Sequence, residues 1–178
     1  MITTASDLYG FFLERVTPLA PQFGVKPTEA VYLANLLASR SQPQRGPSTL
    51  FDLYKKAVEE GGQTAALSYK EIGDRSLFMV GVFPNYFHGR RAVSESYYRN
   101  MGKGAYMSLA SLLSDKRFET LSESFNECVN LIRATMTDVR WSQEDDINDL
   151  YEKWLIGEDP TVEKRVRQLA MPLKVYKA

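Results

Sequence analysis

Apolar residues recur every three or four positions along most of the chain, which is the spacing of amphipathic helices rather than of β-strands. Signals that begin and end helices separate these runs: Pro27 opens one run, and Gly61-Gly62 closes another. The pattern predicts an all-α fold, a compact single-domain bundle of about eight helices over residues 1–178. The helices are expected at residues 6–16, 27–41, 49–60, 64–82, 94–113, 118–137, 142–155 and 160–171.

The run over residues 64–82 is the candidate for the central helix, because its last turns are apolar on more than one side. The longest apolar stretch, from Leu77 to Phe83, is far shorter than the roughly 20 residues that a membrane-spanning helix needs, so we expect no membrane span. In the next expected helix, Gly102 and Gly104 indicate that a neighbouring helix or a ligand comes close to the backbone.

The composition is that of an ordinary globular domain, with 44% hydrophobic and 25% charged residues. Cys128 is the only cysteine, so the chain cannot form an internal disulfide, and the sequence lacks the Cys and His spacing of a structural zinc site. The first residues, from Met1 onward, lack the basic and apolar regions of a secretory signal. These features predict a cytoplasmic protein.

Charge is balanced overall but unevenly distributed. The chain has 22 basic and 22 acidic side chains; residues 90–117 hold 6 basic and 2 acidic ones, whereas residues 118–160 hold 3 and 11. Such a distribution can steer a charged partner at long range, although neighbouring helices can also neutralise one another. Because no broadly basic face is indicated, we expect no nucleic-acid binding.

Motifs for catalysis are weak. The stretch Asp145-Asp146-Ile147-Asn148-Asp149 matches the D-D-x-x-D of isoprenoid synthases, but acidic residues in the first turn of a helix explain it better. His88 is the only histidine, and Cys128 lies on an apolar stripe, where a buried thiol is inert. We therefore expect a binding protein rather than an enzyme, without a metal or cofactor; an enzymatic alternative would use His88 as its acid or base.

The most informative stretch lies between residues 74 and 103, where basic and aromatic side chains alternate with few acidic neighbours. Guanidinium groups beside aromatic rings suit the recognition of a carboxylate, a phosphate or an acidic protein segment. The same side chains can also serve as cover over a helical core. The candidate ligand- or partner-binding residues are Arg75, Tyr86, His88, Arg90, Arg91, Tyr97, Tyr98 and Lys103.

Three motifs in this region carry a resemblance. They are Gly73-Asp74-Arg75-Ser76-Leu77-Phe78, Gly81-Val82-Phe83-Pro84, and Tyr97-Tyr98-Arg99-Asn100-Met101-Gly102-Lys103-Gly104-Ala105-Tyr106. The set resembles one found in a family of uncharacterised helical proteins of Gram-negative bacteria. The resemblance implies a bacterial origin and a shared core or site in the two central helices, and it implies no reaction.

Two functions are expected from the sequence. The first is a non-enzymatic adaptor or regulatory module that binds another protein through its basic and aromatic region or its acidic seventh helix. The second is a small-ligand sensor with a pocket between the fourth and fifth helices for an anionic ligand or a haem-like cofactor, in which Arg75 or His88 fixes the anionic group. The tyrosine-rich helices could equally form a homodimer interface.

Overall fold

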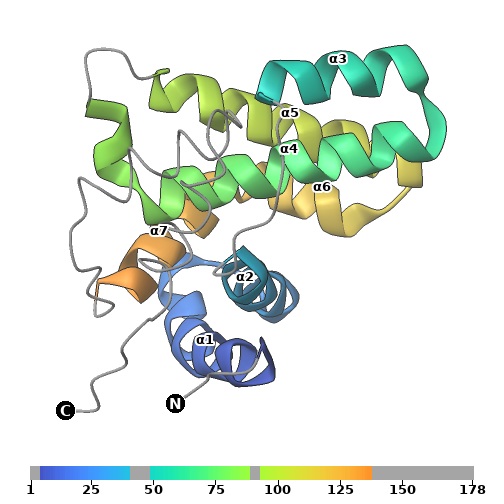
Figure 1. The fold of residues 1–178 in the computed structure, drawn as a ribbon. Coiled ribbons are helices and arrows are strands. Elements are labelled where there is room, and N and C mark those ends of the chain that lie inside the picture. Colours follow the sequence, from blue (N-terminus) through green and yellow to red (C-terminus); the bar gives the residue numbers. More distant parts are fainter. Residues whose placement is uncertain (1–4, 41–48, 89–92, 138–178) are drawn as a thin grey trace.

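The computed structural model describes residues 5–40, 49–88 and 93–137, and these ranges are helical (Figure 1). They contain the α-helices α1 Ala5–Leu19, α2 Pro27–Arg40, α3 Leu50–Glu60, α4 Gly62–Val82, α5 Glu95–Leu113, α6 Lys116–Glu123 and α7 Phe125–Met136, and the 3-10 helices η1 Ala20–Phe23 and η2 Pro84–His88. No strand occurs in the described ranges, so the predicted all-α bundle is confirmed. The helices expected at residues 142–155 and 160–171 lie outside the described residues.

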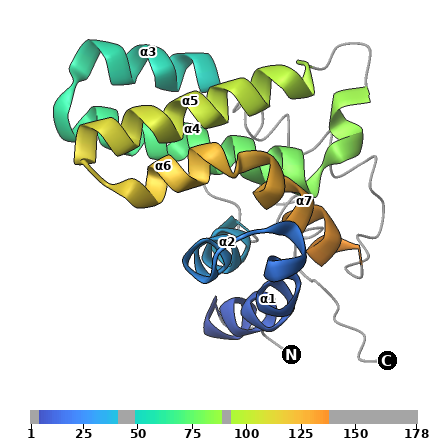
Figure 2. The same ribbon diagram turned by 180° about the vertical axis from the view of Figure 1, so that it is seen from behind.

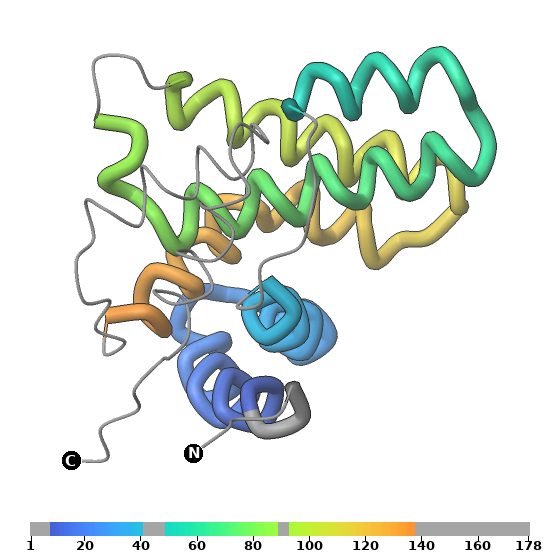
Figure 3. The backbone as a smooth tube through the Cα atoms, in the orientation of Figure 1, coloured from blue at the N-terminus to red at the C-terminus, as the bar shows by residue number. Residues whose placement is uncertain are grey.

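The helix α4 is the central element, as its apolar pattern predicts. It packs against α5, α3, α7 and α2, and every residue from Ile72 to Phe83 is buried. Figures 1 and 2 show α3, α4, α5 and α6 running alongside one another, with α5 and α6 behind α4 in the view of Figure 1 and with α1 and α2 below them as a hairpin. In Figure 3 the hairpin is seen nearly end-on, so its axes cross those of the long helices. The helix α7 contacts both α4 and α1 and joins the two parts.

Local sequence signals fix where several helices begin. Thr49 caps α3 with a capping box, in which the side chains of Thr49 and Asp52 each accept a hydrogen bond from the other's backbone N–H. Ser94 caps α5 by accepting from the Tyr97 N–H at 3.2 Å. Gly61 has a φ of +64° and separates α3 from α4, a conformation that glycine adopts at little cost. The predicted boundaries at residues 49, 61 and 94 are therefore confirmed.

The single helix predicted over residues 118–137 is wrong, because the chain breaks at Ser124 into α6 and α7. The Ser124 hydroxyl lies 2.7 Å from the Thr120 carbonyl and 3.0 Å from the Glu29 carboxylate. A serine hydroxyl that bonds to a backbone carbonyl one turn earlier competes with helical hydrogen bonding and favours helix ends. The contact with Glu29 also links this break to α2. The end predicted for the first helix at residue 16 is also wrong, since α1 continues through Pro18 to Leu19 and is followed by η1.

Glycines let α5 and α7 approach α4 closely. A Cβ atom on Gly73 would lie 2.5 Å from the Tyr106 ring, and one on Gly102 would lie 2.6 Å from the Phe125 ring. The close approach predicted for Gly102 is therefore confirmed, whereas Gly104 is exposed and has open space around it. None of the helices in the described ranges has the length and apolarity needed to cross a bilayer.

Candidate functional site

A buried carboxylate, Asp74 of α4, accepts hydrogen bonds from three side chains. Its Oδ1 accepts from the hydroxyls of Tyr32 on α2, at 2.5 Å, and Tyr106 on α5, at 2.8 Å. Its Oδ2 accepts from the Lys70 ammonium at 2.5 Å. Burying a charge without partners is costly, and these three donors satisfy both oxygens in the core.

The two tyrosines of this cluster stay protonated. Burial and the adjacent Asp74 carboxylate both raise the pKa of Tyr32 above its ordinary value. The same two causes, burial first, raise the pKa of the fully buried Tyr106. Both phenols are therefore donors to Asp74 over the whole physiological pH range.

A second polar network joins α2 to α4 beside the first. Glu71 pairs with Arg40 of α2 and with Arg75, whose Nη2 lies 2.9 Å from Glu71 Oε1. Burial alone would raise the pKa of Glu71, but the hydrogen bonds and charges of Arg40 and Arg75 outweigh it and lower this pKa. Glu71 is thus an ionised anchor between the hairpin and the central helix.

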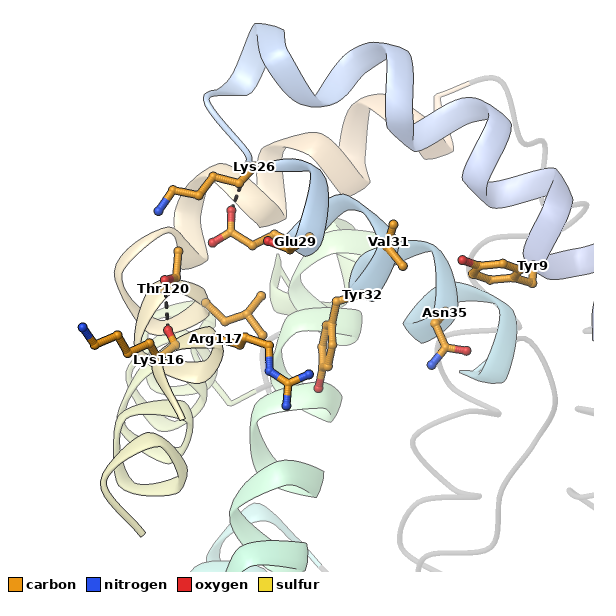
Figure 4. Close-up of a pocket in the computed structure, with 11 residues that line it drawn as sticks. Tyr9, Lys26, Glu29, Val31, Tyr32, Asn35, Lys116, Arg117 and Thr120 are labelled. Carbon is orange, nitrogen blue, oxygen red and sulfur yellow. Dashed lines mark hydrogen bonds between the residues drawn. The ribbon is translucent and has the colours of Figure 1, made fainter. Parts of the chain in front are cut away.

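A groove of about 680 Å³ lies on the other side of Tyr32, between α2 and α6 (Figure 4). Its lining residues come from α1, the start of α2 and the first turns of α6; they are Tyr9, Lys26, Thr28, Glu29, Val31, Tyr32, Asn35, Lys116, Arg117, Thr120 and Leu121. Tyr32 serves both features: its ring lines the groove, while its hydroxyl reaches back to Asp74. The buried network therefore fixes one wall of the groove.

The groove is positively charged. Lys26, Lys116 and Arg117 line it together with a single carboxylate, that of Glu29. Glu29 is buried, accepts a hydrogen bond from the Lys26 backbone N–H at 2.9 Å and lies 3.0 Å from the Ser124 hydroxyl. In the part of the chain that the structure describes, neither lysine ammonium has an ion-pair partner.

Arg117 is held in place but keeps donors to spare. Its Nε and Nη2 donate to the Asp115 carboxylate, at 3.0 Å and 2.6 Å to the nearer oxygens. The side chain is 79% exposed. A guanidinium carries five N–H donors, so the Nη1 edge stays free to bind a second anion.

None of the sequence-predicted site residues in the described ranges lines this groove. Arg75 is buried in its ion pair with Glu71. The rings of Tyr86, Tyr97 and Tyr98 form an edge-to-face cluster with Phe87 at the start of α5, with centroids 5.0–6.4 Å apart. Within this set Tyr98 is buried, the others are half-buried, and none lines the groove.

The remaining predicted residues are less informative. His88 ends η2 and is exposed, and Lys103 is half-buried on α5, where its carbonyl accepts a hydrogen bond from Ser122. Arg90 and Arg91 lie outside the described residues. A binding role for the predicted set stays a prediction.

At Gly73 and Gly102, protein side chains occupy the space expected between the fourth and fifth helices. The ring of Tyr106 occupies the space that Gly73 leaves, and Phe125 occupies the space beside Gly102. The glycines therefore admit side chains of the protein itself rather than a ligand. Sequence reasoning missed the groove instead, because its cations stand about 90 positions apart in the chain, at Lys26 and at Lys116-Arg117.

The described ranges hold no metal-binding cluster, and their one thiol is buried. These ranges hold no cluster of three or more His, Cys, Asp or Glu side chains that could bind a metal ion. Burial raises the pKa of Cys128 to about 12, so its thiol does not ionise at neutral pH.

Comparison with known proteins gives no relative. No protein-family model matches the chain, and no curated protein and no solved structure is similar to it. The resemblance of the three motifs to a bacterial family stays a prediction.

Proposed function

We propose that this protein is a non-enzymatic adaptor or regulatory module that binds another protein through the groove between α2 and α6. The observation that carries the proposal is the groove itself, in which three cationic side chains lie beside an apolar wall (Figure 4). Arginine and aromatic side chains are enriched among the residues that anchor protein interfaces. The exposed position of Arg117 beside Tyr32 fits that pattern.

The reactive groups near the groove are used for structure, which supports binding rather than catalysis. The Tyr32 hydroxyl donates to Asp74, and Asp74 is only 4% exposed and already accepts from three donors. A general acid or base must reach the proton of a substrate to act on it. These groups instead hold the groove wall rigid, which suits a preformed binding surface.

A small anionic ligand is the second candidate function, and the size of the groove favours it. A volume of 680 Å³ falls within the range of about 300–1,000 Å³ that small-molecule pockets occupy. Native mass spectrometry of the purified protein tests this candidate, because a retained ligand would add its mass to the chain. The same spectrum reports whether a second copy of the chain is the partner.

The proposed function is tested by affinity capture with charge-reversal variants. A double variant, Lys116→Glu with Arg117→Glu, reverses the charge at two positions of the groove. The matched control makes the same change at two exposed residues of α3, Lys55→Glu with Lys56→Glu. We expect a partner that the wild type and the α3 control retain and the groove variant loses. If the groove variant keeps every partner of the wild type, the proposal is wrong.

A further inference from the structure

The chemistry of the partner can be read from the shape and charge of the groove. Building on the proposed function, we infer that the groove binds an acidic amphipathic helix of a partner protein, with its apolar stripe on α2 and its carboxylates toward Lys26, Lys116 and Arg117.

The cations of the groove are spread out rather than gathered at one point. Lys26 precedes α2, whereas Lys116 and Arg117 open α6. In Figure 4 the two lysine side chains extend to one side of the groove, and Arg117 points toward Tyr32 instead. A single phosphate or small carboxylate can be reached by only part of this set. Several carboxylates spaced along one ligand can pair with all three cations.

The groove follows one face of α2. Thr28, Val31, Tyr32 and Asn35 all line it, and they stand at the i, i+3, i+4 and i+7 positions of a helix. This face is about 10 Å long at 1.5 Å per residue, which equals two turns. A second helix laid on such a face places its own residues at i, i+3 or i+4, and i+7 in register with it.

The apolar part of the face is open to solvent. Val31 is 46% exposed although it stands in the middle of the groove. Tyr9 and Leu121 flank it from α1 and α6, so the apolar wall is framed by two further helices. Burying Val31 against an apolar side chain of the partner would remove this surface from water.

The first turns of α2 and α6 lie at the groove and accommodate negative charge. Both helices begin at the groove, where the macrodipole favours negative charge, and a carboxylate of the chain already lies at each end: Glu29 accepts from the Lys26 N–H and Asp115 from the Arg117 N–H. The excess positive charge therefore comes from the three cations, and it suits glutamate and aspartate side chains on the flanks of the bound helix. It disfavours a basic or neutral segment of the same shape.

The inference is tested with a synthetic helical peptide and the full-length protein, by fluorescence anisotropy. The probe is a labelled peptide of about 18 residues with leucine and phenylalanine on one stripe and glutamate on its flanks. A second peptide carries glutamine in place of each glutamate, and a third has the same residues with the stripe scrambled. We expect the glutamate probe to bind, and both other peptides to bind at least about tenfold more weakly.

Two matched variants locate the binding site. Val31→Glu places a charge inside the groove. Val58→Glu places a charge on α3, at a position where the valine is 60% exposed. Because both valines face solvent, both variants should fold. We expect Val31→Glu to weaken binding of the probe at least about tenfold and Val58→Glu to leave it unchanged. Neutralising the cations, with Lys116→Gln and Arg117→Gln, should weaken binding and flatten its dependence on salt.

The outcomes separate the inference from the proposed function. If the glutamine peptide binds as well as the probe, if Val31→Glu binds as the wild type does, or if inorganic phosphate displaces the probe at low millimolar concentration, the inference is overturned. If the capture experiment identifies a groove-dependent partner but the helical probe does not bind, the inference falls and the proposed function stands.

Discussion

The Asp74 carboxylate accepts hydrogen bonds from side chains of three helices: Tyr32 of α2, Lys70 of α4 and Tyr106 of α5. It is therefore both a buried charge and a junction. Hydrogen bonds to a charged group are worth about 1.5–3 kcal/mol each, more than neutral ones, and an acceptor that loses its donor is left poorly solvated. At the scale of the residue, this cluster should be the most sensitive polar site in the core.

Removing one hydroxyl from the cluster tests this expectation. Tyr106→Phe should lower the free energy of unfolding by about 1.5–3 kcal/mol, because Asp74 Oδ1 loses one of its two donors. Tyr54→Phe, which removes a hydroxyl from a partly exposed ring on α3, should change it by less than about 0.5 kcal/mol. Urea denaturation followed by circular dichroism measures both. Equal stabilities of the two variants would contradict the assignment.

The Glu71 network predicts a pH dependence. The pKa of Glu71 is lowered in the folded protein from the ordinary value of 4.5, because Arg40 and Arg75 outweigh the effect of burial. A carboxyl whose folded pKa is depressed stabilises the fold above its unfolded pKa, and this stabilisation is lost as the pH falls through the folded pKa. We expect the free energy of unfolding to decrease below about pH 4.5, and Glu71→Gln to lose part of that decrease.

The measurement is urea denaturation at a series of pH values between about 3 and 7. Glu59→Gln is the control, because Glu59 is exposed and, among the residues that the structure describes, it pairs only with Lys55, at 3.8 Å. It should keep the pH dependence of the wild type. If Glu71→Gln and Glu59→Gln give the same curve, the network does not carry the effect.

At the scale of the element, the contact between α4 and α5 depends on two glycines against which side chains of neighbouring helices pack. Gly73 admits the Tyr106 ring of α5, and Gly102 admits Ser76 of α4 as well as the Phe125 ring of α7. These contacts bring three helices together at one level of the bundle. Interiors packed at this density tolerate added atoms poorly.

Gly102 and Gly104, both in α5, form a matched pair that tests this packing. Gly102→Ala should destabilise the protein by about 1–3 kcal/mol, because the new Cβ would lie 2.6 Å from Phe125 and 2.8 Å from the Ser76 Cβ. Gly104→Ala should stabilise it by about 0.5–1 kcal/mol, since nothing lies within 4 Å and alanine is the better helix former. Thermal denaturation gives the sign of each change. Effects of the same sign would contradict the packing described for Gly102.

At the scale of the whole molecule, the α1–α2 hairpin is fastened to the rest along one face of α2. Glu29 contacts Ser124, Tyr32 donates to Asp74, and Arg40 pairs with Glu71. Glu29 and Tyr32 lie in the first two turns of α2, and Arg40 is its last residue. Between Tyr32 and Arg40, the side chains of Leu33, Leu36 and Leu37 are buried. The groove is formed across this junction, so the docking of the hairpin also sets its shape.

Weakening two of these links should loosen the hairpin before the central helices. In the double variant Tyr32→Phe, Arg40→Gln, we expect backbone amides of α1 and α2 to exchange with deuterium at least about tenfold faster, while those of α4 and α5 change less. Hydrogen exchange with mass spectrometry resolves the two regions. A uniform increase over all four helices would show that the hairpin and the long helices open as one unit.

Local patterns in the sequence predict most of the helices and much of the core. Apolar residues at helical spacing predict α2 to α5, and short-range signals at Thr49, Gly61 and Ser94 fix where helices begin or end, because a cap acts within three or four residues. The apolar last turns of the 64–82 run also predict the central helix. The local pattern does not predict the break at Ser124. The Ser124 hydroxyl contacts both the Thr120 carbonyl, four residues earlier, and Glu29, which lies 95 positions away.

Which polar residues meet depends on how the helices pack against one another. The sequence favoured the basic and aromatic stretch between residues 74 and 103, because its side chains are close along the chain. In the structure Arg75 is buried against Glu71, and the cations that share a groove are Lys26, Lys116 and Arg117. Helical periodicity states which face of each helix is buried, but it does not state which helices are neighbours. The ion pairs and the shape of the groove depend on which helices are neighbours. Packing between helices far apart in the chain determines this.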